Sequence, residues 1–151
     1  MSKYKDADLI LKLYDLRREA TMREARNWFF SFDPQSTKDF MDVLTSEKSG
    51  FYRMVVSYWE MAASLVNHGA IDAEMFNDAN GEHIFVYAKM EPFIPALREE
   101  NGNPQFLEHL EKLVKEMPEY ETKVKAVRER IQKIVEIYQQ RLAAKAAAAG
   151  N

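Results

Sequence analysis

Hydrophobic residues recur along the chain at intervals of three and four positions, which is the spacing of one face of a helix. The stretch from about Asp6 to Arg18 carries Leu9, Ile10 and Leu13 in this way. No stretch of useful length alternates between apolar and polar residues, as a half-buried strand would. The pattern therefore predicts an all-α fold, an irregular multi-helix bundle of about six to eight helices.

Residues that favour helix ends separate these segments. Thr21 and Glu24 have the spacing of a capping box at the start of a second helix. Gly69 stands where a left-handed C-terminal cap is expected. Asn103 followed by Pro104 is typical of a helix start. Five glycines and five prolines in 151 residues leave little sequence for long loops.

The segment from Phe51 to His68 is the most apolar in the chain and predicts a central helix covered on several sides. Its polar residues follow one another at steps of four, three, four and three, so they form one line along the helix. The line consists of Arg53, Ser57, Glu60, Ser64 and Asn67. It faces solvent, a cleft or a subunit interface, and the sequence leaves these alternatives open.

Glu60 needs a partner if this line is covered, because a buried unpaired carboxylate is costly or becomes protonated. Arg53 lies two turns away, roughly 10 Å along the axis, which makes direct pairing awkward. Arg26 and Arg98 each lie among apolar residues at helical spacing and are the better candidates. We therefore expect a buried polar network of Arg26, Glu60 and Arg98, as a structural ion pair in preference to a catalytic site.

The last helix, expected from about Glu119 to Ala149, differs from the rest in charge. From Glu119 to the C-terminus, seven lysines or arginines outnumber four glutamates, so this part carries +3 and the remainder −6 of the total −3. The apolar residues resemble a coiled-coil seam: Val124, Val127, Ile131, Ile134 and Tyr138. A helix of thirty residues spans about 45 Å, which exceeds the width of such a domain. We expect part of it to project and to contribute to a homodimer.

Composition bounds the class of protein. The length fits one domain, which we place at residues 1–142, followed by an alanine-rich tail at 143–151 that is prone to fraying. The absence of cysteine excludes disulfides, thiolate metal sites and cysteine nucleophiles, and it suits a cytoplasmic location. No apolar run reaches the ~20 residues of a membrane span. A mildly acidic chain has no general attraction for nucleic acid.

Known catalytic and cofactor motifs are missing. None of His68, His83 and His109 has a second histidine three or four residues away, so we expect no metal site and place each histidine at the surface or a helix end. The chain has no phosphate loop, nucleophile elbow or dinucleotide fingerprint, so we expect no cofactor. These observations favour a protein that is not an enzyme.

Three stretches resemble an uncharacterised bacterial all-helical family of unknown function. They are residues 13–18 with 25–29 (LYDLRR and ARNWF), residues 58–72 (YWEMAASLVNHGAID) and residues 95–98 (PALR). Some members of that family carry an N-terminal membrane segment, which this chain lacks. The resemblance implies a helical fold and brings no activity, so it assigns no catalytic residue.

Two main hypotheses about function follow. The favoured one is a non-enzymatic interaction or regulatory module that acts through a protein surface. The alternative is a small-ligand-binding protein or enzyme with a site near Glu60 and Arg98. Nucleic-acid binding through the basic residues of the last helix is the weakest, because glutamates are mixed among them and no continuous basic stripe results.

Overall fold

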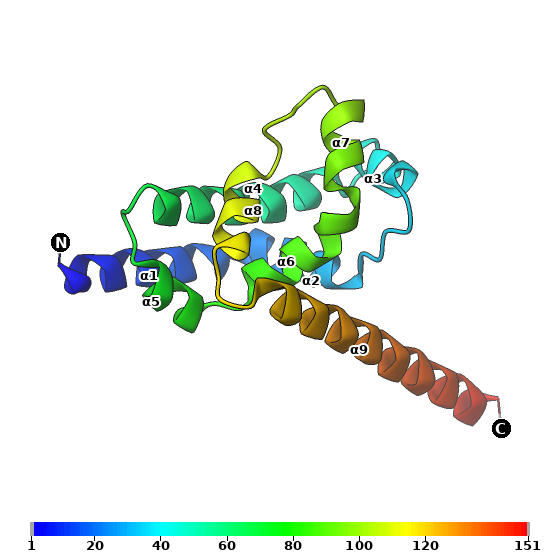
Figure 1. The fold of residues 1–151 in the computed structure, drawn as a ribbon. Coiled ribbons are helices and arrows are strands. Elements are labelled where there is room, and N and C mark those ends of the chain that lie inside the picture. Colours follow the sequence, from blue (N-terminus) through cyan, green and yellow to red (C-terminus); the bar gives the residue numbers. More distant parts are fainter. Residues whose placement is uncertain (1, 151) are drawn as a thin grey trace.

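The structure is a computed structural model that describes residues 2–150, and these residues form an all-α fold with no strand (Figure 1). The prediction of a helical bundle with a long C-terminal helix is thereby confirmed. The elements in chain order are α1 (Lys3–Arg17), α2 (Ala20–Ser31), α3 (Thr37–Leu44), α4 (Ser49–Asn67), α5 (Ala73–Ala79), α6 (Glu82–Met90), the 3-10 turn η1 (Glu91–Phe93), α7 (Ile94–Glu100), α8 (Glu108–Lys115) and α9 (Tyr120–Ala149).

Helix α4 is the central helix that its apolar sequence predicts. It packs against α2 and α8, with α3 and α5 also in contact. Trp59 is 1% exposed, and the small residues Ala62 and Ala63 are fully covered, which lets neighbouring helices approach closely. A helix that is covered on several sides buries apolar surface on each side. Each large apolar side chain that is buried stabilises the fold by about 2 kcal/mol.

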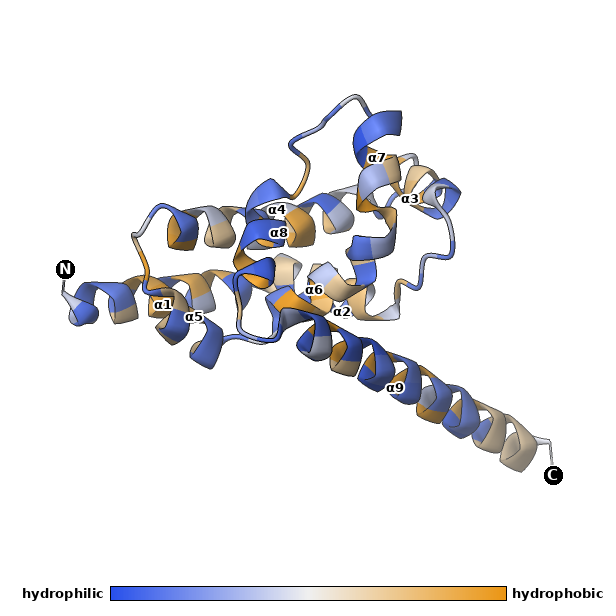
Figure 2. Ribbon diagram, viewed as in Figure 1, coloured by the Kyte–Doolittle hydropathy of each residue, from blue (hydrophilic) through white to orange (hydrophobic). Residues whose placement is uncertain are grey.

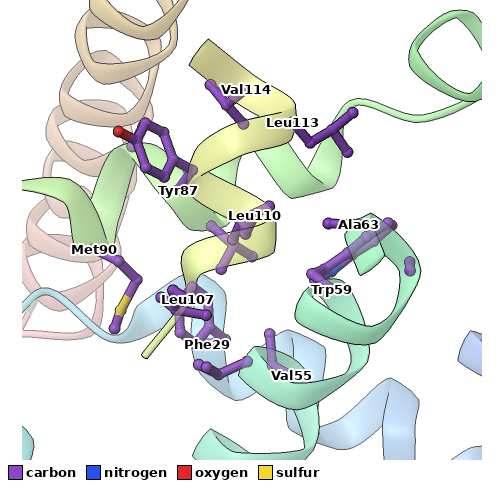
Figure 3. Close-up of a cluster of buried hydrophobic side chains, with 14 of the residues drawn as sticks. Phe29, Val55, Trp59, Ala63, Tyr87, Met90, Leu107, Leu110, Leu113 and Val114 are labelled. Carbon is purple, nitrogen blue, oxygen red and sulfur yellow. The ribbon is translucent and has the colours of Figure 1, made fainter. Parts of the chain in front are cut away.

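Helix α8 fills the space between α4 and α6. Leu110 and Leu113 on α8 lie beside Trp59 and Ala63 of α4, and Val114 lies towards Tyr87 of α6 (Figure 3). All of these side chains are buried. The short helix therefore joins the two halves of the core.

Two helix starts differ from the sequence expectation. The cap of α2 is Glu19, whose carboxylate accepts from the backbone N–H groups of Thr21 and Met22 at 3.0 and 2.9 Å, so the capping box at Thr21 is wrong. Helix α8 begins at Glu108 and not at Pro104, because Leu107 adopts a left-handed conformation with φ of 57°. The left-handed cap at Gly69 is confirmed, with φ of 81°.

Helix α9 leaves the body as an arm (Figure 1). It follows Glu119, which is also left-handed (φ 57°), and its first turns pack on α6 through the buried Val124. Val127, Ile131 and Val135 are half-buried, and every described residue after Val135 is exposed. Hydrophilic and hydrophobic residues are mixed along most of its length, and its last turns before the C-terminus are mildly hydrophobic (Figure 2). Within residues 2–150, no helix is long and apolar enough to cross a membrane.

Candidate functional site

The polar line of α4 divides into two parts. Arg53 and Ser57, in the first half of the helix, are exposed. Glu60, Ser64 and Asn67, in the second half, are half-buried where α8 crosses α4. The line therefore meets solvent at one end, which is one of the alternatives that the sequence leaves open, and a packed helix of the same chain at the other, which is not among them.

Glu60 caps the N-terminus of α8. One carboxylate oxygen accepts from the backbone N–H of Leu110 at 2.7 Å, and the other accepts from that of His109 at 3.2 Å. The first N–H groups of a helix have no partner within the helix, and a negative charge there is stabilised by the helix dipole. No residue of the preceding loop caps α8 with its side chain, so the cap comes from a helix about fifty residues earlier.

Asn67 holds the same turn of α8 from the other end of the line. Its side-chain amide donates to the carbonyl oxygen of His109 at 3.0 Å and lies 3.3 Å from Nδ1 of that residue. The ring of His68 lies 5.6 Å from the ring of His109, centroid to centroid. Together, Glu60 and Asn67 fix the position and the direction of α8 on α4.

Arg26 takes part in a different cluster. Its guanidinium forms an ion pair with Glu82 at 2.8 Å, and Arg17 reaches the same carboxylate at 3.2 Å. Arg26 also donates to the carbonyl oxygen of Arg17 at 3.3 Å. Nearby, the hydroxyl of Tyr58 donates to the carbonyl of Leu13, and burial raises its pKa to about 12. This cluster joins α1, α2 and α6 below α4.

Arg98, on α7, contacts the loop that leads to α8. Its Nε donates to the carbonyl oxygen of Phe106 at 2.9 Å, and its guanidinium pairs with Glu111 at 3.3 Å. The expected pairing of Glu60 with Arg26 or Arg98 is therefore wrong. Backbone N–H groups satisfy Glu60, and each arginine has a carboxylate of its own. A ligand-binding role for Arg26, Glu60 and Arg98 stays a prediction.

His83 is the second residue of α6, at a helix end as expected, but it lies in the core and not at the surface. Its side chain is fully buried beside Trp59 and Phe76, with ring centroids 5.8 and 5.1 Å away. Its Nε2 lies 2.8 Å from Oδ1 of Asn77, which assigns the proton to Nε2 of a neutral ring. Burial lowers the pKa of His83 to about 4. In the sequence, only the apolar neighbours Ile84 and Phe85 indicate that His83 is buried.

Lys89 is a half-buried basic group whose partners the sequence does not indicate. Its ammonium donates to the carbonyl oxygens of Phe29, Phe30 and Phe32 at 2.7, 3.0 and 2.5 Å. These carbonyls close α2, where a cation is favoured by the helix dipole. Burial lowers the pKa of Lys89 to about 8, and the nearby Asp33 opposes this shift.

Two clefts are relevant to binding. One, of about 500 Å³, lies between α4 and the α7–α8 loop and is lined by Arg53, Ser57, Glu60 and Phe106 among others. The other, of about 540 Å³, lies where α9 leaves the body. In the described part of the chain, no three histidine, aspartate or glutamate residues are grouped so that they could hold a metal ion.

The helical body of the chain matches the model of a protein family. Residues 4–117 match the model of a family described as a domain of unknown function, DUF4760, and because the match covers most of the chain, the chain belongs to that family. No curated protein and no solved structure matches the chain. The matched region ends at Met117, and the α9 arm begins three residues later, at Tyr120.

The cap on α8 predicts the effect of replacing Glu60. A Glu60→Gln variant keeps the size of the side chain but loses the charge and one of the two acceptor oxygens. We expect the free energy of unfolding to fall by about 1–2 kcal/mol. Urea denaturation at neutral pH measures the change, with Ser57→Ala on the exposed part of the line as the control. Unchanged stability in Glu60→Gln would contradict the capping role.

His83 predicts a dependence of stability on pH. The unfolded histidine titrates near 6.5 and the folded one near 4, so below pH 6.5 the unfolded chain binds a proton that the folded chain does not. The free energy of unfolding should therefore fall by about 3 kcal/mol as the pH drops from 7 to 4.

Comparing the pH dependence of the free energy of unfolding between variants separates the contribution of His83 from that of the carboxylates. His83→Phe should lose this part of the pH dependence, and His68→Gln, at an exposed site, should keep it. Equal pH profiles for wild type and His83→Phe would show that His83 is not held neutral in the fold.

Proposed function

We propose that the protein is a non-enzymatic interaction or regulatory module that forms a homodimer through α9. The exposed apolar row on the outer half of this helix carries the proposal. Ile134 is 57% exposed, Tyr138 64% and Leu142 49%. Ordinary protein surfaces rarely expose several large apolar side chains in a continuous row. Such a row is typical of a surface that binds another protein.

The row continues the face with which α9 packs on its own body. Val124 is buried, Val127 and Ile131 are half-buried, and Ile134, Tyr138 and Leu142 extend this apolar face beyond the body. The same helix face is thus covered at its base and uncovered at its end. A second helix against this face would cover the remaining residues in the way that a coiled coil does.

The chemistry of the candidate residues also supports a role outside catalysis. Both oxygens of Glu60 accept from α8, and Arg26 and Arg98 are engaged by Glu82 and Glu111. Groups with these structural partners would have to give them up to bind a substrate, at a cost of a few kcal/mol each. The proposal includes a cytoplasmic location and no nucleic-acid partner, since Glu129 and Glu136 lie among the basic residues of α9.

Sedimentation velocity tests the homodimer. We expect the wild-type chain to sediment as a dimer and a triple variant, Ile134→Ser, Tyr138→Ser and Leu142→Ser, to sediment as a monomer. The replaced residues make few contacts within one chain, so the variant should keep its helical circular dichroism. The control is Leu11→Ser with Leu16→Ser, two exposed apolar positions on α1. A wild-type monomer at every accessible concentration would remove the homodimer from the proposal.

A second candidate function is the binding of a small anionic ligand in the cleft between α4 and the α7–α8 loop. The supporting observation is Arg53, which lines this cleft and forms no hydrogen bond or ion pair with any other described side chain. Its guanidinium could receive a carboxylate or phosphate, with the apolar part of the ligand against Phe106.

Titration with benzoate and with inorganic phosphate, followed by the amide NMR signals of Ser57 and Phe106, tests this candidate. Saturable shifts in the wild type that vanish in Arg53→Gln would support it. Shifts that persist in Arg53→Gln, or no shifts at all, would exclude the two probes as ligands of this cleft.

A further inference from the structure

The groove at the base of α9 is a candidate binding site for a helix. It lies between α9, the α2–α3 loop and the segment around η1, and has a volume of about 540 Å³. Pro34 and Phe93 line it from the body, and Ile131 and Val135 line it from α9. Asp33 and Glu136 add acidic groups at its rim.

The two cations in this groove already have partners. Arg128 pairs with Glu91 at 2.6 Å and donates to the carbonyl oxygen of Ala88 at 3.2 Å. Lys89 is bound to the three carbonyls that close α2. Asp33 lies near the Lys89 ammonium without a salt bridge, and Glu136 forms no ion pair with another described residue, so Glu136 is the acidic group at the rim with no cation beside it.

The tip of α9 has the complementary chemistry. From Ile137 to Ala149 it carries Arg141 and Lys145 and no acidic residue. After the apolar Tyr138 and Leu142, six of the last seven helical residues are alanines. Small side chains allow a helix to lie close to another surface, and alanine favours the helix itself.

From these two surfaces we infer that the α9 tip of a second copy lies antiparallel along α9 and occupies this groove. The inference rests on the homodimer proposed above and specifies its geometry. With the crossing near Tyr138, the partner's alanine-rich turns lie beside Ile131 and Val135. Its Arg141 and Lys145 lie near the acidic rim. Because the arrangement has two-fold symmetry, each copy contributes one tip and one groove.

A parallel pair would use these surfaces less well. It would place each Arg141 beside the other and each Lys145 beside the other, with like charges in contact. It would also align the two helix dipoles, and the grooves at the base of both arms would stay empty. The antiparallel pair instead adds the groove to the apolar row. This enlarges the contact towards the roughly 1,200 Å² that a stable interface needs.

The chain has no cysteine, so single cysteines report the geometry without background. Ile134→Cys and Leu142→Cys lie eight residues apart, which is about 12 Å along the helix. The two variants are mixed, one with a size tag, re-equilibrated and mildly oxidised. We expect mostly mixed disulfides between the two variants, because position 134 of one copy then lies opposite position 142 of the other. In-register parallel helices would give only like-with-like products.

A second pair of variants tests the groove. Gln35→Cys on the body and Ala146→Cys on the tip should be joined between copies by a short flexible bis-maleimide. Glu47→Cys, exposed on the α3–α4 connection, should give no mixed product with Ala146→Cys. A dimer that yields only like-with-like products, or no body-to-tip product, overturns the antiparallel seat alone. A monomer overturns the homodimer and this inference together, so the two failures are distinct.

Discussion

The seating of α8 on α4 is the constraint on which the rest of the structure depends. Helix α8 is short, yet its apolar face closes the core between α4 and α6 (Figure 3). An eight-residue helix is not stable alone in water. Its position comes from buried leucines on one side and from the bonds of Glu60 and Asn67 to its first turn. Because α9 follows α8 after a short turn, this seating also sets where the arm leaves the body.

The charged and polar groups inside the body act mainly on helix ends and connections. Glu60 stabilises the start of α8 and Lys89 the end of α2, while Arg98 holds the loop before α8. Glu82 draws together Arg17 and Arg26 from two helices. Such groups fix how helices meet, since a buried carboxylate or ammonium is tolerated only where specific partners surround it. These contacts give each of the candidate residues Arg26, Glu60 and Arg98 a structural role.

The arm stands in contrast to the body. Its base is fixed by Val124 and by the pair between Arg128 and Glu91, and its outer half has no cover within one chain. The family match ends at Met117, before the arm begins. An ordered helix with an uncovered apolar row and an opposite charge to its own body is well suited to association with a second copy.

The sequence alone determined the class of fold, the central place of α4 and the length of α9, because helical periodicity and caps such as Gly69 act within a few residues. It also identified the polar line on α4, but not its use. The partner of Glu60, the burial of His83 and the late start of α8 depend on residues tens of positions apart. Contacts of that kind are decided by how helices pack, which local spacing does not encode. Only the tertiary structure could show that Glu60 binds backbone N–H groups, which no side-chain pattern in a sequence reveals.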